Sequence, residues 1–316
     1  MTYAIELDKV GHSFSGKPVL KNIQCSLARG QLMALLGHNG AGKSTFIKIL
    51  LGLIEPQQGT VNILGLPIKQ LCGGVEVGYL PENIKFYDNM TGKQVLQFFA
   101  DLKGVNTQLV TCTLEEFGLL ESQHKQVKYY SKGMKQRLGF AQAIIASPQL
   151  LLLDEPTVGL DPQASQFLYQ KINQLREQGC SVVICTHELA LIEEHIDVAL
   201  MLGRGEQLAY GSINALAAQS GCMVTFIVPN IETLVLKKPV LSPYYFQGTL
   251  RCFPEDKSIV IQLLTEICST YEFDIQLPSL TDIYHHKMKV QRLTTGGLSF
   301  ANQSFQQQEV KDVIAC

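Results

Sequence analysis

The segment GHNGAGKS at residues 37–44 constrains the fold of this 316-residue chain more than any other feature. It matches the pattern GxxxxGK[ST], follows an apolar run at residues 31–36, and opens a stretch with helical periodicity at residues 43–51. Such a strand–turn–helix unit wraps backbone N–H groups around phosphate oxygens, and the helix dipole adds positive potential. Lys43 is expected to reach the β- and γ-phosphates, and the Ser44 hydroxyl to bind Mg²⁺. The predicted nucleotide-binding residues of the turn are His38, Asn39, Gly40, Ala41, Gly42, Lys43, Ser44 and Thr45.

Two carboxylates, Asp154 and Glu155, follow a wholly apolar run at residues 150–153. Ligands of open α/β sheets bind at the carboxyl ends of the strands. If residues 150–153 form a strand, the two carboxylates lie at such an end. Asp154 is expected to orient Mg²⁺, and Glu155 to activate the attacking water as a general base. An apolar run ending in Asp-Glu is common by itself, but its combination with the Lys43 turn predicts ATP hydrolysis.

Composition limits where such an ATPase can act. No apolar stretch approaches the ~20 residues that a bilayer span needs, and residues 1–10 lack the basic and apolar regions of a signal peptide. If the protein works at a membrane, another chain is expected to cross it. The net charge of −2 gives no general attraction to nucleic acid or anionic lipid. Nine dispersed cysteines without a CxxC pair favour a reducing compartment over a zinc or dithiol site.

Strand and helix patterns alternate over the first two thirds of the chain. Strands are predicted at residues 3–10, 31–36, 75–80, 150–153 and 181–185, with a hairpin at 198–209. Asp161 is expected to cap a helix that has Pro162 in its first turn and stops at Gly179. This alternation predicts an α/β fold with a mostly parallel sheet. Composition changes near residue 220, so the predicted domains are a nucleotide-binding domain at 1–218, a small α+β accessory domain at 219–292 that includes a helix at 279–288, and a flexible tail at 293–316.

Several further segments follow the order and spacing of the ATP-binding cassette (ABC) ATPases. YSKGMKQR at residues 130–137 is similar to the family's signature, DEPTVGLDP at 154–162 resembles its Walker B motif and D-loop, and CTHE at 185–188 resembles its switch-histidine segment. YLPE at 79–82 resembles the Q-loop, although Glu82 replaces the usual glutamine. Phe14 stands where the family places an aromatic ring on adenine. The resemblance covers residues 1 to about 215, and no other P-loop class carries the signature.

The resemblance implies both a fold and a set of roles. The fold is that of a P-loop NTPase, with a RecA-like parallel core, an antiparallel β subdomain and a helical signature subdomain. His187 would act with Glu155 in hydrolysis, and Glu82 joins Ser44 and Asp154 as a candidate for Mg²⁺. In ABC proteins the signature contacts the γ-phosphate held by a second copy, and the matching residues here are Ser131, Lys132, Gly133 and Met134, with Asp161 in the D-loop.

The residues themselves support the signature assignment. Ser131 can cap the helix that follows, and residues 123–152 contain lysine and arginine but no Asp or Glu. The Ser131 hydroxyl, the Gly133 N–H and the helix dipole are therefore expected to form an anion site. Blander interpretations are a solvated basic helix face for this segment, a structural role for His187, and simple packing for Phe14.

Narrower phrases resemble one branch of the family. GHNG at 37–40, LPEN at 80–83, YYSKGMKQRLGFAQ at 129–142 and LPSLTDIY at 277–284 are similar to the NosF-type ATPase subunits of NosDFY transporters, which are required for copper-site maturation of nitrous oxide reductase. This implies a homodimer that uses ATP and Mg²⁺ on the cytoplasmic side of the inner membrane. It also implies a NosY-like transmembrane permease, a NosD-like periplasmic subunit, and no nucleic-acid partner.

Other functions remain open at this point. They are the ATPase of a generic ABC-2-type exporter, a soluble ABC ATPase acting on ribosomes or DNA, and a small-molecule P-loop kinase. A metal site at His285, His286 and Met288 is a further alternative, which is disfavoured because adjacent helical residues point in different directions.

Overall fold

The computed structural model of the chain describes residues 2–70 and 76–295, and its centre is a ten-stranded sheet. The strand order is β5-β4-β1-β2-β10-β9-β3-β8-β7-β6. Strands β9, β3, β8, β7 and β6 are parallel, whereas β1, β2, β4 and β5 pair antiparallel. The bounds are β1 Tyr3–Phe14, β2 Lys17–Ala28, β3 Leu32–Leu36, β4 Gln58–Ile63, β5 Leu66–Pro67, β6 Val77–Leu80, β7 Leu150–Asp154, β8 Ser181–Cys185, β9 Val198–Gly203 and β10 Glu206–Gly211.

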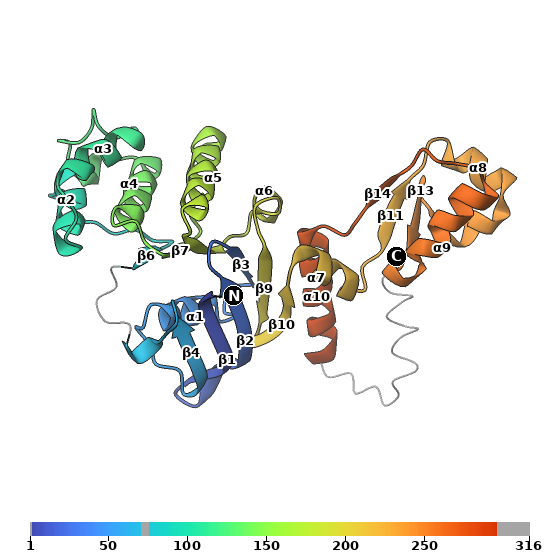
Figure 1. Ribbon diagram of the computed structural model, residues 1–316, viewed down its shortest axis with the longest axis horizontal. Helices are drawn as coiled ribbons and strands as arrows, with labels where there is room; N and C mark the ends of the chain where they lie inside the picture. The colour runs from blue at the N-terminus through green and yellow to red at the C-terminus, as the bar shows by residue number, and fades with distance from the viewer. Residues whose placement is uncertain (1, 71–75, 296–316) are drawn as a thin grey trace.

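Helices cover the sheet from two sides, so the residues of β3, β7 and β8 are buried almost without exception. One hydrophobic core lies between the parallel strands and the layer that contains α2, α3, α4 and α5. A second core surrounds α1 and includes the antiparallel strands. Figure 1 shows α2, α3 and α4 grouped at one end of the molecule, with α1 and the antiparallel strands below the parallel sheet. The helices are α1 Lys43–Leu50, α2 Gly92–Leu102, α3 Gln108–Glu116, α4 Lys132–Ile144, α5 Pro162–Glu177, α6 Leu189–Ile192 and α7 Ile213–Gln219.

This architecture confirms the predicted α/β fold with its parallel core, antiparallel β subdomain and helical subdomain. Asp161 caps α5 by accepting a hydrogen bond from the Ala164 N–H at 2.8 Å, with Pro162 in the first turn. The predicted hairpin is the β9–β10 pair. The strand predicted at residues 3–10 runs on to Phe14, because β1 pairs with β2 over its whole length.

The accessory domain has the chain order β11-α8-β12-β13-α9-β14 and the sheet order β12-β13-β11-β14. All its neighbouring strands are antiparallel, which is the split βαβ arrangement of ferredoxin-like folds. Its own core includes Phe226, Leu250 and Val260. The small α+β unit expected from the sequence is therefore present. Its elements are β11 Val224–Ile227, α8 Ile231–Lys237, β12 Tyr245–Phe246, β13 Thr249–Cys252, α9 Lys257–Gln262 and β14 Asp274–Gln276.

Helix α10, Leu280–Thr295, returns from the accessory domain to the nucleotide-binding domain (Figure 1). Leu280 and Ile283 are fully buried in the core beside the parallel sheet. The Leu280 N–H donates to Oε1 of Glu193 at 2.9 Å, and the Gln291 amide donates to the Gly203 carbonyl at 2.8 Å. The sequence assigned this helix to the accessory domain and began the tail at residue 293. The structure instead packs α10 on the first core and continues it to Thr295, while residues 296–316 lie outside the described part of the chain.

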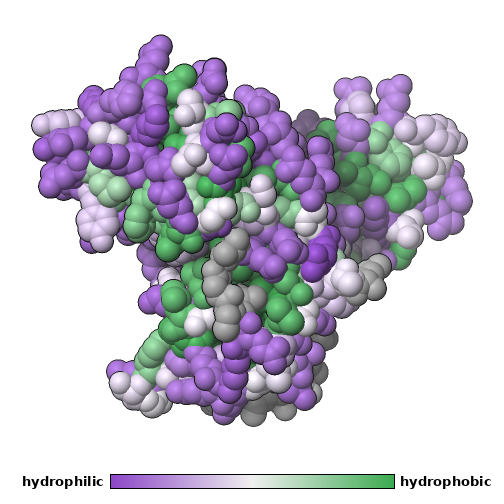
Figure 2. Space-filling model, turned by 60° about the vertical axis from the view of Figure 1, so that its left-hand side comes forward, coloured by the Kyte–Doolittle hydropathy of each residue, from purple (hydrophilic) through white to green (hydrophobic). Residues whose placement is uncertain are grey.

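Among residues 2–70 and 76–295, no helix is both long enough and apolar enough to span a bilayer. Figure 2 shows hydrophilic side chains over the outer surfaces of the lobes, and apolar ones gathered where the lobes meet.

Candidate ATP-binding site

The phosphate-binding turn, residues 37–45, connects β3 to α1 and can be formed only with glycine at defined positions. Gly42 caps α1 with a left-handed φ of 110°. A Cβ at Gly42 would lie 2.9 Å from the Val19 carbonyl oxygen, and a Cβ at Gly37 would lie 2.6 Å from the Leu202 carbonyl oxygen. The surrounding backbone therefore leaves no room for a side chain at either glycine. Gly40 has a φ of 82° and faces open space, which leaves the backbone accessible to a phosphate.

Lys43 lies over this turn. Its ammonium donates to the carbonyl oxygens of Gly37 and His38, the latter at 3.4 Å. The Ser44 side chain is exposed at the first turn of α1, and Thr45 is buried against the core. A positive charge, an exposed hydroxyl and the N-terminus of an eight-residue helix thus meet at one place, which suits a polyphosphate.

Three neighbouring parallel strands bring the other predicted residues to the same edge. Strand β8 lies between β3 and β7, and Cys185 pairs with Leu35 on one side and Asp154 on the other. The turn of residues 37–45 follows β3, Glu155 follows β7, and His187 follows β8. The carboxyl ends of the three strands therefore place Lys43, Asp154, Glu155 and His187 together, as the sequence predicted.

Glu155 is held in an unusual backbone conformation. Its φ is 49°, in the left-handed region that costs a residue with a side chain about 1–3 kcal/mol. Its N–H donates to the Cys185 carbonyl at 2.9 Å, and its own carbonyl accepts from the Gln136 amide at 3.3 Å. Gln136, buried on α4, also donates to the Pro156 carbonyl at 2.9 Å. These bonds from two sides fix the direction in which the carboxylate points. Gln136 could not be found from the sequence as a residue of this site, because a glutamine on a helix carries no signal of its own.

The Glu155 carboxylate faces His187. The His187 N–H lies 3.4 Å from Oε2, and Nε2 lies 3.3 Å from Oε1 without forming a hydrogen bond. Oε1 is buried and has no hydrogen-bond partner among the residues that the structure describes. Burial raises the pKa of Glu155, the neighbouring His187 lowers it, and Asp154 raises it further. A carboxylate with a raised pKa and a free, aimed oxygen can accept a proton from water, which is what a general base requires.

Oxygen ligands suited to Mg²⁺ lie around Asp154. Burial raises the pKa of Asp154, the Glu82 carboxylate raises it further, and Lys43 and a hydrogen bond with the Cys185 thiol lower it. Two carboxylates close to a buried strand end, with the Ser44 hydroxyl nearby, form a hard-oxygen donor set of the kind that Mg²⁺ prefers. In the described ranges no three His, Cys, Asp or Glu side chains form a metal cluster, so this ion would also need phosphate oxygens. Bound there, Mg²⁺ would neutralise phosphate charge.

The signature residues lie at the N-terminus of α4. Ser131 caps this helix by accepting from the Met134 N–H at 3.2 Å. Lys132 and Gly133 pack against Gly159 of the D-loop, since a Cβ at Gly159 would lie 2.6 Å from Cδ of Lys132. Across residues 2–70 and 76–295 no hydrogen bond or ion pair joins residues 131–134 to the turn of their own chain. The segment is therefore a capped helix N-terminus that is not bonded to the phosphate-binding turn of its own chain within the described residues.

Phe14 ends β1 with a half-exposed ring. The ring meets His12 edge to face, at 4.7 Å between centroids. His12 pairs across the strands with Leu20, and Leu20 touches the position a Cβ would take at Gly42. Residues directly opposite on paired strands share a face, so Phe14 is on the side of the sheet that leads to the phosphate-binding turn.

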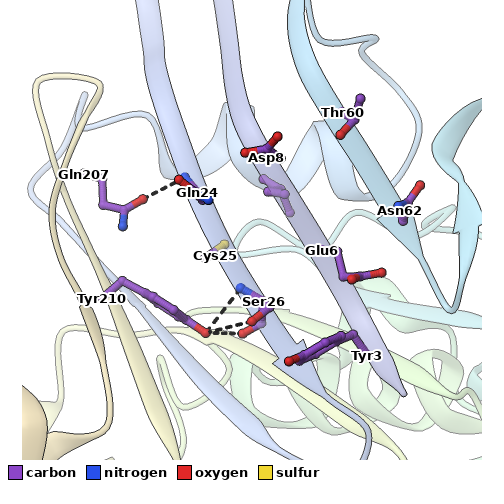
Figure 3. Close-up of a pocket in the computed structure, with 11 residues that line it drawn as sticks. Tyr3, Glu6, Asp8, Gln24, Cys25, Ser26, Thr60, Asn62, Gln207 and Tyr210 are labelled. Atoms are coloured by element: carbon purple, nitrogen blue, oxygen red, sulfur yellow. Dashed lines mark hydrogen bonds between the residues drawn. The ribbon is translucent and has the colours of Figure 1, made fainter. Parts of the chain in front are cut away.

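Two hollows in the described part of the chain differ in how they lie relative to this constellation. One, of about 590 Å³, lies on the outer face of β1, β2, β4 and β10 and contains none of the predicted residues. Figure 3 shows the Glu6 and Asp8 carboxylates on β1 and the Tyr210 hydroxyl bonded to Ser26 across β10 and β2. The other, of about 410 Å³, is lined by His187 and by residues of α6 and α10. His285 therefore lies in the same hollow as the switch histidine, whereas His286 lies beside Gly221. Among residues 2–70 and 76–295 no three His, Cys, Asp or Glu side chains gather as a metal cluster.

Comparison with known proteins agrees with this geometry. Residues 20–158 match the family model described as ABC transporter. The chain is 35% identical over 271 residues to a Nod factor export ATP-binding protein of Rhizobium sp. (strain N33), covering 82% of this chain and 89% of that protein. It is 40% identical over 200 residues to an uncharacterized ABC transporter ATP-binding protein of Synechocystis sp., covering 61% of this chain and only 56% of that relative.

A solved structure shows the same fold. The ATP-binding subunit of an ABC transporter superposes with a TM-score of 0.65 at 30% identity, covering 68% of this chain and 92% of the other. The chain belongs to the ATP-binding subunits of ABC transporters, a family of ATPases. Subunits of this class bind ATP, typically dimerise, and work with a transmembrane partner.

Proposed function

We propose that two copies of this chain enclose two ATP molecules head to tail and drive an exporter-type permease. The observation that carries the proposal is the pairing of Glu155 with His187 at the strand ends beside Lys43. Lys43 and the turn bind the phosphates, Phe14 stacks on the base, and Ser44 and Asp154 hold the cation. Glu155 takes a proton from the attacking water, and His187 orients the γ-phosphate and the carboxylate. The export direction is suggested by the Nod factor export relative.

The second copy is needed because each site is only half built within one chain. The N-terminal end of α4 at residues 131–134 is capped by Ser131, and in the described part of the chain no hydrogen bond or ion pair joins it to the turn of residues 37–45. In a head-to-tail pair, this end would contact the γ-phosphate held by the other copy, and Asp161 would anchor the D-loop between the two sites. The dipole and N–H groups of the α4 N-terminus would then stabilise the negative charge of the γ-phosphate, together with the phosphate-binding turn of the other copy.

A mixing experiment tests this arrangement. A Lys43→Ala chain lacks a working turn but keeps its signature, and a Ser131→Arg chain lacks a signature but keeps its turn. Each alone should lose hydrolysis, and Lys43→Ala should also lose nucleotide affinity. Their equimolar mixture should regain activity, because one of the two sites in a mixed dimer then has both halves. A mixture as inactive as the separate variants would contradict sites shared between copies. A Ser131→Arg chain that hydrolyses ATP normally would do the same.

A more specific assignment is supported by the phrases at residues 37–40, 80–83, 129–142 and 277–284, which resemble NosF-type subunits. In this second candidate the permease is NosY-like, a NosD-like subunit lies in the periplasm, and the complex at the inner membrane serves copper-site assembly of nitrous oxide reductase. Deleting the gene and measuring the copper content of nitrous oxide reductase separates the candidates. If nitrous oxide reductase is made in wild-type amounts but lacks copper, the NosF-type role is supported. If its copper content is unchanged, the exporter function is favoured.

A further inference from the structure

Two short segments run side by side at the catalytic edge of the sheet. Residues 155–157 follow β7, and residues 186–188 follow β8. The first link between them is the approach of His187 to the Glu155 carboxylate, at 3.3 and 3.4 Å. The second lies two residues further along the first segment and one along the second: the Thr157 hydroxyl donates to Oε2 of Glu188 at 2.6 Å. The segments are therefore joined at two levels.

The second link has the properties of a strong contact. Thr157 is 3% exposed, so in the folded chain its hydroxyl is shielded from water. The acceptor is a carboxylate, and hydrogen bonds with an ionised partner are shorter and stronger than neutral ones. The hydroxyl of Tyr169 lies beside both groups: burial and the Glu188 carboxylate raise the pKa of Tyr169, and the Thr157 side chain lowers it. The short hydrogen bond of the Thr157 hydroxyl is the one to Glu188. Tyr169 in turn stacks on His195, which ties the pair to the protein interior.

The hydrogen bond between Thr157 and Glu188 affects the position of His187, because the His187 side chain itself is weakly constrained. The His187 side chain is 61% exposed and lacks the packing that would fix it. Its chain neighbours are constrained instead: Thr186 is buried and accepts from the Glu188 N–H at 3.0 Å, and Glu188 begins α6. With Glu188 fastened to Thr157, the backbone of residue 187 is fixed at both ends, next to a Glu155 whose own backbone is strained.

We propose that Thr157 and Glu188 are a positioning pair for hydrolysis, which sets the spacing between His187 and the Glu155 carboxylate. In this proposal the pair acts through His187 and Glu155 and not by direct contact with the substrate. It acts by holding the two segments in register, so that the imidazole and the carboxylate meet the γ-phosphate from fixed directions. This inference rests on the proposed roles of Glu155 and His187, and it adds two residues that the family resemblance does not assign.

The test uses four variants of the full-length chain, each measured for kcat, ATP affinity and Tm. Thr157→Val keeps the shape and removes the hydroxyl, and Glu188→Ala removes the acceptor. Each should lower kcat by about 10- to 100-fold, the worth of a hydrogen bond to a charged group, with ATP affinity unchanged. Thr157→Ser keeps the hydroxyl and should retain most of kcat. The double variant Thr157→Val/Glu188→Ala should be no slower than either single variant, because both remove the same link.

Controls separate the pair from general destabilisation and from the proposed function. Thr111→Val changes an exposed threonine of α3 and should leave kcat unaltered. If Thr157→Val and Glu188→Ala lower Tm but not kcat, or if their effects simply add, the positioning role is wrong. If Thr157→Val does not fold, the positioning role can still be tested with Thr157→Ser and with Glu188→Gln, which keeps an oxygen acceptor. Both variants must retain a kcat near the wild-type value, while Glu188→Ala must not. Glu155→Gln in the same assay reports on the proposed function alone, since its full activity would refute the base whatever the pair does.

Discussion

The side-chain amide of Gln136 donates to the Pro156 carbonyl at 2.9 Å and so ties the signature helix α4 to the backbone that carries the catalytic carboxylate. The same amide lies 3.3 Å from the Glu155 carbonyl. Signature and base belong to two different ATP sites in the proposed dimer. A single buried side chain therefore joins the element that would touch one nucleotide to the element that would hydrolyse the other.

Replacing Gln136 should uncouple these elements. In Gln136→Leu the Pro156 carbonyl loses its donor, and the Glu155 carbonyl keeps only the Val158 N–H at 3.3 Å. The loss costs about 1–3 kcal/mol of stability and frees the strained segment at Glu155. We expect kcat to fall at least about tenfold with ATP affinity retained. The matched control is Gln142→Leu on the same helix, because buried Gln142 also donates to a carbonyl, that of Tyr79, at 2.8 Å. Equal kcat losses in both variants would show that only the stability of α4 is at stake.

Glu155→Gln should retain ATP binding and stop turnover. The amide keeps the size of the carboxylate but cannot accept a proton, and general-base catalysis contributes about 100- to 10,000-fold. The nucleotide sandwich should then persist, so size-exclusion chromatography with ATP should show a dimer that the wild-type protein does not accumulate. Hydrolysis within a few-fold of wild type would mean that another group removes the proton.

Stability should depend on pH through the same carboxyl. Burial raises the pKa of Glu155 above its ordinary 4.5, so the folded chain binds more protons than the unfolded chain between 4.5 and the raised value. Stability is therefore lost as pH rises through that window, and ionised Glu155 destabilises the nucleotide-free protein at neutral pH. Glu155→Gln should raise Tm by a few degrees at about pH 8 and by nothing at about pH 4. A Tm gain that is the same at both pH values would exclude this cause.

Much of the fold was predictable because its signals are local. The apolar runs that became β3, β7 and β8, the glycines of the phosphate-binding turn, and Asp161 before Pro162 all act on neighbouring residues, and all were found where expected. The catalytic edge followed from them, because parallel strands end together.

The missed features depend on contacts between distant segments. Gln136 reaches 19 and 20 residues along the chain, and Thr157 reaches 31 residues to Glu188. The sequence places helix α10 in the accessory domain because it follows that domain along the chain. In the structure, Leu280 and Ile283 are instead buried in the first core. Nothing local marks such partners, since each residue fits its own element equally well without them.

Glu82 replaces the glutamine that is usual at this position, and its contribution to Mg²⁺ binding can be tested. Burial raises the pKa of Asp154 and the charge of Glu82 raises it further, so the two carboxylates interact electrostatically. If Glu82 binds Mg²⁺ directly, Glu82→Gln keeps an oxygen ligand and should weaken the Mg²⁺ requirement of hydrolysis only a few-fold, while Glu82→Ala should weaken it at least about tenfold. If Glu82 acts only through its charge, the two variants should shift the Mg²⁺ dependence equally, because both remove one negative charge. Titrating hydrolysis with Mg²⁺ at fixed ATP distinguishes these outcomes, and unchanged Mg²⁺ dependence in both variants would remove Glu82 from the cation site altogether.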